Sequence, residues 1–426
     1  MKKFIQTLIQ FKAKRAVRKY KPRVVAITGS VGKTSTKNAI AAVLKAKFDV
    51  RAAEENYNNE FGVPLAILGE KSPGRSIFGW LKVLLKNEKP FPQVLVLEFG
   101  ADKPGDIAEL CALVSPEVGV VTPITSVHVE KYGSDMEKLA AEKRKLIESL
   151  SANGLAVLSG DDERVRNFAM VSKAPVVTYG FGSSAVQGRD LTIDTREDFS
   201  FEPGETFATT KFSIRTKNNS YEVVLKNALG RSQITAALAA IAVGEHFGLT
   251  AEEMLPVLAE VQPVVGRLCP LPGIKGSLII DDSYNAAPAS TASALKVLSH
   301  FAPREDRSRI AVLGDMSELG THSEAEHRSI GLQAVSVADL LVCVGEKAKG
   351  IAAGAREAGM DATKIIELSN SIEAGRFMDR QIKQGDIVLV KGSQSMRMEK
   401  VVKDLMAEPL RASELLVRQY GKWLES

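Results

Sequence analysis

The chain has 426 residues, of which 45% are hydrophobic and 25% are charged. This length suggests about two or three domains, and the composition excludes a disordered or fibrous chain. No apolar run approaches the roughly 20 residues that cross a bilayer, and no cleavable signal stands at the N-terminus. Because Cys111, Cys269 and Cys343 form neither a metal-binding spacing nor a disulfide framework, we expect buried thiols in a reducing, cytoplasmic protein.

The N-terminal 23 residues hold the basic character of the chain. They contain nine Lys or Arg and no acid, whereas the remainder holds 47 basic and 51 acidic residues. Apolar residues recur at helical spacing as Phe4, Leu8 and Phe11, with Ile5 and Ile9 beside them. This arm is either an amphipathic helix on an anionic membrane or a helix packed on the protein with its charges in water, and we favour the second. No nucleic-acid motif follows, so no nucleic-acid partner is expected.

The next segment predicts a phosphate-binding loop. A β-branched apolar run ends at Thr28, a glycine turn follows, and a helical pattern covers residues 38–44. Backbone N–H groups and the helix dipole favour an anion at such a junction. Lys33 can reach the terminal phosphates of a nucleotide, and the Thr34 hydroxyl can bind Mg²⁺. The general P-loop pattern has a glycine where this chain has Ile27, so the alternative is a plain strand–helix turn. The candidate phosphate-binding residues are Gly29, Ser30, Gly32, Lys33, Thr34 and Ser35.

The pattern of strands and helices predicts an α/β fold. Strand-like runs and helical patterns alternate from Val24 to about Tyr179, as in a mostly parallel sheet with crossover helices. Residues 190–226 alternate apolar and polar side chains, as an antiparallel meander does. Prolines and glycines cluster at residues 263–276, and a second, Rossmann-like α/β unit starts at Ser277. The expected parts are the arm 1–23, a P-loop ATPase domain 24–268 and a C-terminal domain 269–426.

Further polar residues stand where the carboxyl edge of the first sheet is expected, which is where α/β sheets bind ligands. Glu98 ends one strand, His128 follows the next, and Lys143 lies on the helix after that. Each has a structural alternative: a capping or paired glutamate, a structural histidine and a surface lysine. The amide-rich loop of Asn56, Asn58 and Asn59 forms at least a turn and could position a substrate.

The motifs form an ordered set from about Val24 to Met406. They are Gly29-Ser30 with Gly32-Lys33-Thr34, Asn56 with Asn58-Asn59, Gly62 and Pro64, Glu98 with Gly100-Ala101, His128, Gly133-Ser134, Gly266-Arg267, Asp281-Asp282-Ser283-Tyr284-Asn285-Ala286, Gly314-Asp315-Met316, Glu318-Leu319-Gly320 and Lys391-Gly392-Ser393. This set resembles the Mur ligases, and within them the branch that joins D-alanyl-D-alanine to a UDP-N-acetylmuramoyl-tripeptide. The resemblance implies an ATP-dependent amide-bond ligase of peptidoglycan precursor synthesis that uses two Mg²⁺ ions.

The resemblance also implies roles for single residues. Lys33 and Thr34 would hold the ATP phosphates and the first Mg²⁺, Glu98 would ligate Mg²⁺, and His128 would ligate the second ion. Lys143 matches a lysine that the family carbamylates to make an anionic metal ligand. Further contacts are implied with ATP by Arg267, Asp282, Tyr284 and Asn285, and with the substrate by Asn56, Asn58, Asn59, Lys391 and Ser393.

Two departures from the family pattern leave alternatives open. Gln233 stands where the family usually has an adenine-contacting Asn. This branch of the family also carries an N-terminal domain for the UDP end of its substrate, whereas the phosphate loop here follows directly on the basic arm. The alternatives are a Mur-type ligase with another acceptor, such as polyglutamate or an archaeal cell-wall peptide, or a non-catalytic scaffold at a membrane. A monomer with at most peripheral contact to an anionic membrane is expected.

Overall fold

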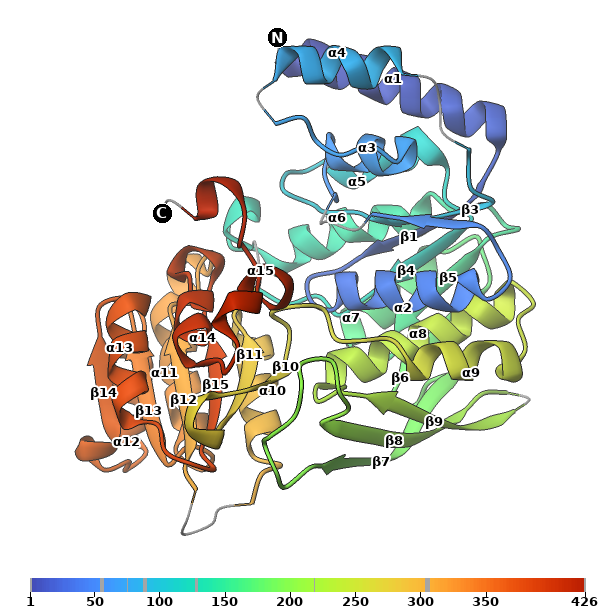
Figure 1. Ribbon diagram of the computed structural model, residues 1–426. Coiled ribbons are helices and arrows are strands. Elements are labelled where there is room, and N and C mark those ends of the chain that lie inside the picture. The colour runs from blue at the N-terminus through green and yellow to red at the C-terminus, as the bar shows by residue number, and fades with distance from the viewer. Residues whose placement is uncertain are drawn as a thin grey trace. The chain divides into compact units, whose positions relative to one another are not determined.

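The computed structural model describes residues 2–53, 57–74, 76–86, 90–126, 129–217, 219–302 and 307–424. The chain divides into two compact units, of which the first contains residues 1–191, 211–225 and 232–261 and the second contains residues 192–210, 226–231 and 262–426. Figure 1 shows the course of the chain through both units.

The first unit is built on a nine-stranded sheet of order β2-β3-β1-β4-β5-β6-β7-β8-β9. The strands are β1 (Arg23–Thr28), β2 (Val50–Ala52), β3 (Val94–Glu98), β4 (Val118–Val121), β5 (Leu155–Ser159), β6 (Val176–Gly180), β7 (Val186–Thr195), β8 (Ala208–Arg215) and β9 (Ser220–Lys226). Pairing is parallel from β2 through β7. A short turn joins β8 to β9, so this pair is antiparallel. The predicted parallel sheet with an antiparallel extension is confirmed.

Helices cover this sheet and form a further layer outside it. They are α1 (Lys2–Tyr20), α2 (Lys33–Lys45), α3 (Gly62–Leu68), α4 (Ile77–Leu85), α5 (Asp106–Val114), α6 (Met136–Glu148), α7 (Glu163–Arg166), α8 (Arg231–His246) and α9 (Ala251–Ala259). In Figure 1, α1 and α4 lie beyond α3 and α5 as the outermost layer of this unit. The sequence did not lead us to expect α4.

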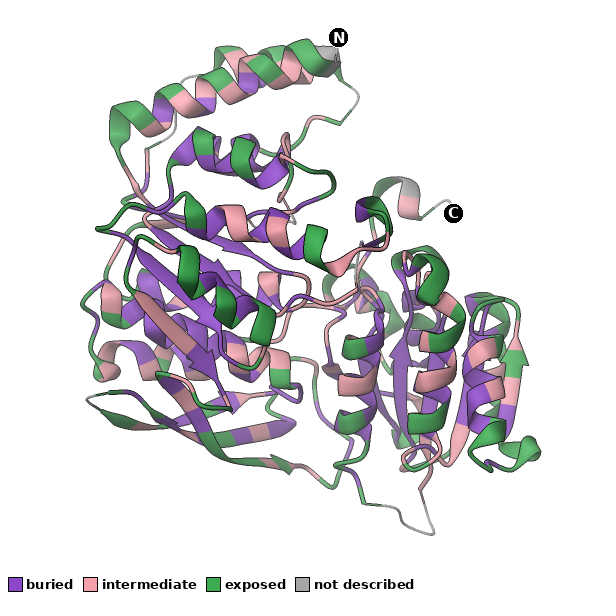
Figure 2. Ribbon diagram, turned by 180° about the vertical axis from the view of Figure 1, so that it is seen from behind, coloured by how far each residue is buried: buried purple, intermediate pink, exposed green. Residues whose placement is uncertain are grey.

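The N-terminal helix packs on the protein by one face. Ile9, Ala13 and Ala16 of α1 are buried in a cluster that includes Val63 of α3 and Ile107 of α5. The expected packed helix is therefore present, and Figure 2 shows that much of the rest of α1 is exposed. None of the helices in the described part of the chain combines the length and hydrophobicity needed to span a bilayer.

The second unit contains a six-stranded sheet of order β10-β11-β15-β12-β13-β14. Its strands are β10 (Cys269–Pro272), β11 (Leu278–Asp282), β12 (Arg309–Gly314), β13 (Leu340–Val344), β14 (Ile365–Leu368) and β15 (Ile387–Lys391). Its helices are α10 (Pro288–Leu298), α11 (Ser323–Ala334), α12 (Lys349–Glu357), α13 (Ser371–Gln381), α14 (Glu399–Leu405) and α15 (Ala412–Leu415). All pairings are parallel except that of β10 with β11. This is the predicted Rossmann-like arrangement.

All three cysteines are free thiols. Cys111 and Cys343 are buried, as predicted, and burial raises the pKa of the Cys111 thiol to about 11. Cys269 differs from the prediction because it is only partly buried at the start of β10.

Candidate active site

The loop between β1 and α2 has the backbone geometry of an anion-binding turn. Gly29 has φ 139° and Gly32, which precedes α2, has φ 85°, values that favour glycine. A Cβ atom at Gly29 would lie 2.0 Å from Thr122 Oγ1. Ser30 N donates to Pro123 O over 2.9 Å, which anchors the loop to the segment after β4. The N-terminus of α2 is thus held in place by its neighbours.

The first turn of α2 presents three polar side chains beside this loop. Lys33 Nζ donates to Ser30 O over 3.3 Å. Thr34 and Ser35 are buried, and Thr34 Oγ1 donates to Glu98 Oε2 over 3.0 Å. The predicted phosphate loop and the predicted carboxylate therefore meet through a direct side-chain contact.

Glu98 is a buried carboxylate at the carboxyl end of β3. Only 3% of its surface is exposed, and its backbone pairs with Ile27 of β1. Its second oxygen, Oε1, accepts from Asn58 Nδ2 over 3.2 Å. Gly100 N donates to Asn58 O over 2.6 Å, which fixes the amide-rich loop against the end of β3. Asn58 thus contacts Glu98 beside the phosphate loop.

The other asparagines of that loop have different outcomes. Asn59 Oδ1 accepts from Phe61 N over 3.1 Å and from Gly62 N over 2.8 Å, so it caps the start of α3. Asn56 lies outside the described residues, as does His128. The amide of Asn59 therefore has a structural task in the helix cap.

Lys143 on α6 points into the same site. It is 3% exposed, and its Nζ donates to Gly29 O over 2.9 Å, so the surface-lysine alternative is wrong. Burial, followed by the positive charge of Lys33, lowers the pKa of Lys143 to about 7. A substantial neutral fraction of this amine is therefore present near neutral pH.

A second group of predicted residues gathers in the second unit. Lys391 Nζ lies 2.7 Å from Asp282 Oδ2 and donates to Asn285 O over 2.8 Å. The Arg267 guanidinium lies 4.3 Å from the centre of the Tyr284 ring. Lys391 and Asp282 are both buried, so their charges are paired away from water. The set joins the ends of β11 and β15 into one polar cluster.

Ser393 and Gln233 complete the predicted positions. Ser393 Oγ accepts from Ser317 N over 2.7 Å in the second unit, just after β15. Gln233 lies half-buried in the first turn of α8, in the first unit.

Family models match most of the chain. Residues 27–244 match the Mur ligase middle domain, and residues 266–394 match the Mur ligase, glutamate ligase domain. The chain belongs to the Mur ligase family.

Individual relatives of this Mur ligase bear names that refine the family. It is 32% identical over 386 residues to the UDP-N-acetylmuramoyl-tripeptide–D-alanyl-D-alanine ligase of Escherichia coli K12, a match that covers 90% of this chain and 76% of the relative. It is 28% identical to the Bacillus subtilis 168 protein of the same name, over 95% of this chain and 80% of the relative.

Solved structures give the same relationship. The MurF ligase of Thermotoga maritima in complex with ADP superposes with a TM-score of 0.76 at 26% identity, covering 94% of this chain and 83% of that one. MurF of Acinetobacter baumannii superposes with a TM-score of 0.75 at 25% identity, covering 94% and 79%.

The oxygens at the loop of this Mur ligase suit a magnesium ion. A carboxylate and a hydroxyl are hard donors, and Mg²⁺ is usually bound by one or two carboxylates together with water and substrate phosphates. Glu98 and Thr34 supply such a pair. No cluster of three His, Cys, Asp or Glu able to hold a metal occurs within the described ranges. The unmodified Lys143 amine is not an oxygen ligand, so its metal-binding role would require modification.

Two positioning contacts were missed by the sequence reasoning. Glu142, next to Lys143, accepts from Gly105 N and Ile107 N over 2.9 Å each and so ties α6 to the start of α5. Arg418, in the C-terminal tail, pairs with the buried Glu399 at 2.9 Å and donates to the backbone oxygen of Tyr284. A Glu-Lys pair on a helix resembles any surface pair, and a lone arginine in a tail carries no motif, so neither gave a usable signal.

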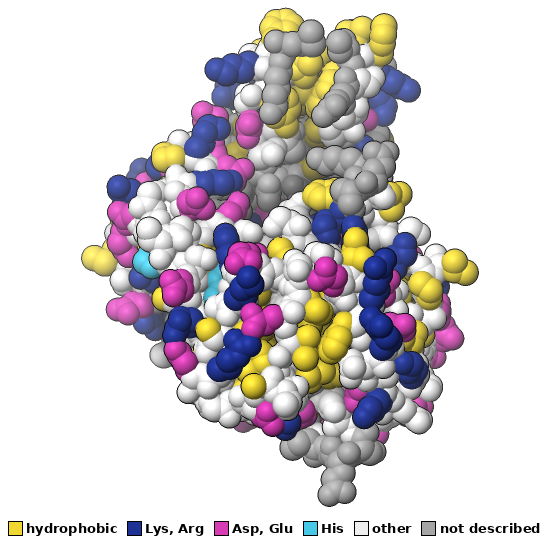
Figure 3. All heavy atoms as spheres, turned by 90° about the vertical axis from the view of Figure 1, so that its left-hand side faces the viewer, with side chains coloured by type: hydrophobic (Ala, Val, Ile, Leu, Met, Phe, Trp, Pro, Cys, Tyr) yellow, Lys and Arg dark blue, Asp and Glu magenta, His cyan; other side chains and the backbone are white. Residues whose placement is uncertain are grey.

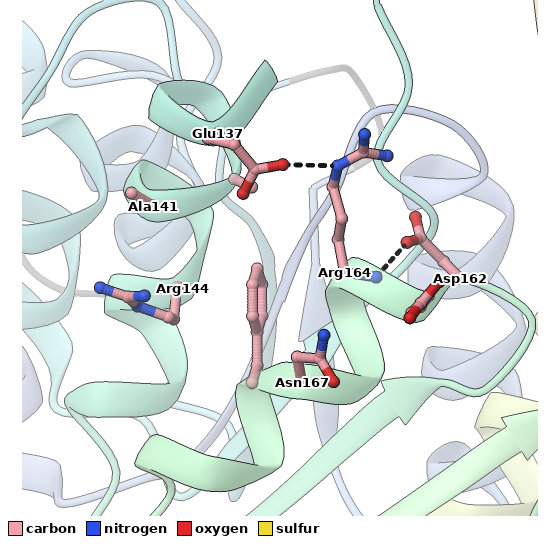
Figure 4. Close-up of a pocket in the computed structure, with 9 residues that line it drawn as sticks. Glu137, Ala141, Arg144, Asp162, Arg164 and Asn167 are labelled. Atoms are coloured by element: carbon pink, nitrogen blue, oxygen red, sulfur yellow. Dashed lines mark hydrogen bonds and ion pairs between the residues drawn. The ribbon is translucent and has the colours of Figure 1, made fainter. Parts of the chain in front are cut away.

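A cavity of about 410 Å³ between α6 and α7 is separate from these residues. Figure 4 shows its side chains, including the ion pair between Arg164 Nε and Glu137 Oε1 at 2.9 Å. None of the predicted site residues lines it. We assign no function to this cavity.

Proposed function

We propose that this Mur ligase joins D-alanyl-D-alanine to a UDP-N-acetylmuramoyl-tripeptide, with conversion of ATP to ADP and phosphate, in peptidoglycan precursor synthesis. The observation that carries the proposal is the contact of Thr34 with Glu98 beside the glycine loop. The names of the relatives and the ADP complex of the similar Thermotoga maritima ligase support the choice of substrates and nucleotide.

The reaction requires two successive displacements. The carboxylate of the tripeptide attacks the γ-phosphorus of ATP, the bond to the β–γ bridging oxygen breaks, and ADP leaves with an acyl phosphate formed. The amine of D-alanyl-D-alanine then attacks the acyl carbon, phosphate leaves, and the amine loses a proton to solvent as the amide forms. Both reactants of the first step are anionic, so cationic groups must offset their repulsion.

Residues of the first unit are suited to that task. Lys33 would leave Ser30 O for the γ-phosphate, and the N–H groups at the start of α2 would face the phosphate chain. Thr34 and Glu98 would hold Mg²⁺, and His128 a second ion. When bound, Mg²⁺ neutralises charge on the phosphate oxygens. Asn58 keeps Glu98 oriented. Asn56, Asn58 and Asn59 would contact the substrate.

The proposal includes carbamylation of Lys143. The protonated lysine first loses a proton to give the neutral amine. The neutral amine then adds to CO₂ with formation of an N–C bond and loss of a second proton, so that an anion with two oxygens stands where the cation stood. The buried position of Lys143 against Gly29 of the loop supports this role. An anionic oxygen group there would suit Mg²⁺ better than an amine does.

The second unit would contribute the remaining contacts. Arg267 would approach the ATP phosphates, and Asp282, Tyr284 and Asn285 the nucleoside, while Lys391 and Ser393 would position the substrate. We place the nucleotide domain at 24–268, with Gln233 as an adenine contact, and the C-terminal domain at 269–426. The two family matches at 27–244 and 266–394 support this division.

The test is a ligation assay with the full chain, ATP, Mg²⁺, UDP-N-acetylmuramoyl-tripeptide and D-alanyl-D-alanine. Mass spectrometry should find the pentapeptide product, with one phosphate released per bond. Parallel reactions offer a polyglutamate acceptor with glutamate, and an archaeal-type cell-wall peptide. A product only in those reactions would overturn the proposed acceptor. If no mixture yields a product or releases phosphate, that result would favour a non-catalytic scaffold.

A further inference from the structure

The outer face of α1 is apolar at one end and cationic at the other. Phe4 and Phe11 are 67% and 68% exposed, whereas Ile9 is fully buried. At about 100° per residue, both rings face away from Ile9. Arg15 and Arg18 continue the exposed face toward the C-terminal end of the helix. Thus one face of α1 holds the helix on the protein, and the opposite face offers aromatic rings and positive charge to the surroundings.

Helix α4 adds a second apolar stripe. Phe78, Leu81 and Leu85 are 85%, 50% and 74% exposed, while Val83 is buried. These three side chains recur at a spacing of three and four residues, so they share one face. Single exposed apolar side chains are ordinary, but five large ones on two neighbouring helices form a patch of the kind that marks an interaction site.

A direct contact joins the two helices. Lys12 Nζ of α1 donates to three carbonyl oxygens at the end of α4: Val83 O over 2.8 Å, Leu84 O over 3.1 Å and Lys86 O over 2.6 Å. Figure 1 shows α1 and α4 side by side at the outermost edge of the first unit. We call the exposed faces of α1 and α4 together the α1–α4 surface.

Positive charge predominates around the α1–α4 surface. Helix α1 (Lys2–Tyr20) holds seven Lys or Arg and no acid, and residues 77–86 hold Lys82 and Lys86 and no acid. At the top of Figure 3, hydrophobic side chains stand between Lys and Arg side chains on either side. A cavity of about 680 Å³ beside α4 is lined by Arg51, Lys71, Lys82 and Lys86, against one acid, Glu70.

The positive charge of the α1–α4 surface indicates which kind of partner binds there. A second copy of the chain would bring two cationic surfaces together, which like-charge repulsion opposes. An anionic bilayer provides both complements at once, since its headgroups attract Lys and Arg and its interface accepts Phe and Leu. We propose that the α1–α4 surface docks on an anionic lipid bilayer as a peripheral contact. The proposal is independent of the ligation reaction.

Vesicle flotation tests the docking with the full chain. The protein should float with phosphatidylglycerol-containing vesicles, should not float with phosphatidylcholine vesicles, and should be released as NaCl is raised, because surface charge attraction is screened. The double variant Phe4→Ser/Phe11→Ser should bind roughly tenfold or more weakly, since lost apolar burial weakens partitioning. Arg15→Glu with Arg18→Glu should weaken binding by a similar factor.

Matched controls separate docking from general effects. Met170→Ser removes an even more exposed apolar side chain (86%) elsewhere in the first unit and should leave binding unchanged. Arg215→Glu with Lys217→Glu is the matching charge control. In a fluorescence version, emission from Phe78→Trp should shift to the blue with anionic vesicles, and emission from Met170→Trp should not.

Three outcomes overturn the proposal. One is equal binding by the parent and by both α1 double variants, each shown to be folded by its thermal melt. Another is an absence of binding to anionic vesicles at low salt. The third is a concentration-dependent dimer in lipid-free buffer that Phe4→Ser/Phe11→Ser abolishes, because a second copy would then be the occupant. Ligation activity enters none of these readouts, so failure here leaves the proposed function standing.

Discussion

Thr34 Oγ1 donates a 3.0 Å hydrogen bond to Glu98 Oε2, and this contact links the first turn of α2 to the end of β3. Both side chains are buried, Thr34 at 5% exposed and Glu98 at 3%. A hydroxyl and a carboxylate held together at a helix N-terminus form a compact oxygen site where a nucleotide phosphate and Mg²⁺ can meet.

Glu98→Gln should keep the oxygen that accepts from Thr34 and remove the charge. Because the proposed role of Glu98 is to bind Mg²⁺, we expect turnover to fall by about 10²–10³ and the Mg²⁺ concentration for half-maximal activity to rise. Glu109→Gln, at an exposed position on α5, is the control and should behave like the parent. A Glu98→Gln variant with unchanged Mg²⁺ dependence would contradict the metal role.

Lys33→Ala should abolish most ligation while leaving the fold intact. The side chain is proposed to offset the charge that accumulates as the carboxylate approaches the γ-phosphate, and loss of one such contact lowers rates by about 10²–10³. Lys45→Ala, at the exposed end of the same helix, serves as the control. Circular dichroism checks folding, and turnover within a few fold of the parent would count against the assignment.

Lys143→Ala should lose most activity and regain part of it with acetate or propionate. The added carboxylate would replace the oxygens of a carbamate, which the variant cannot form. Parent enzyme in CO₂-depleted buffer should also slow, and bicarbonate should restore it. Since the pKa of Lys143 lies at about 7, the response to bicarbonate should be weaker at pH 6, where the amine is mostly protonated. Lys138→Ala, exposed on α6, should show neither effect; no rescue and no bicarbonate response in the parent would rule out the carbamate.

Asp281→Asn should flatten the pH dependence of stability. Burial raises the pKa of Asp281 from 3.8 to about 6, and among the described residues its Oδ2 has no hydrogen-bond partner. Between these two values the folded protein retains a proton that the unfolded chain has lost, so the free energy of unfolding falls as pH rises. The fall approaches about 3 kcal/mol above pH 6.

In the parent, Ser283 N donates a hydrogen bond to Asp281 Oδ1 over 3.0 Å. An asparagine at this position stays neutral at all these pH values, and its side-chain oxygen can accept the same hydrogen bond. At pH 7.5 the variant should be more stable than the parent by about 1–3 kcal/mol. Urea unfolding from pH 4 to pH 8 measures both curves. Asp361→Asn is the control. Hydrogen bonds from Thr363 lower the pKa of Asp361, so this carboxyl is ionised in both the folded and the unfolded protein above about pH 4. The slope of unfolding free energy against pH in that range should therefore match that of the parent. Parallel curves for the parent and Asp281→Asn would show that Asp281 does not titrate in this window.

The local pattern of residues along the sequence was sufficient to predict much of the fold and the residues at the centre of the candidate site. The glycine loop, the strand ending in Glu98 and the second α/β unit follow from residue order, because parallel strands bring their carboxyl ends to one edge. Buried strands can also be predicted from continuous apolar runs in the sequence, as β3 and β4 show. These features depend on neighbours in sequence or on the general geometry of parallel sheets.

The sequence by itself determined the family motifs, the alternation of strands and helices, and the cationic N-terminal arm. Only the tertiary structure decided that Lys143 is buried against Gly29, that Asn59 caps α3, and that Phe4 and Phe11 face outward while Ile9 packs inward. The physical reason is that burial and hydrogen-bond partners depend on residues far apart in the chain. The spacing of apolar residues along a helix shows which side chains lie on the same face. Only the neighbouring elements that pack against the helix decide which of its faces is buried.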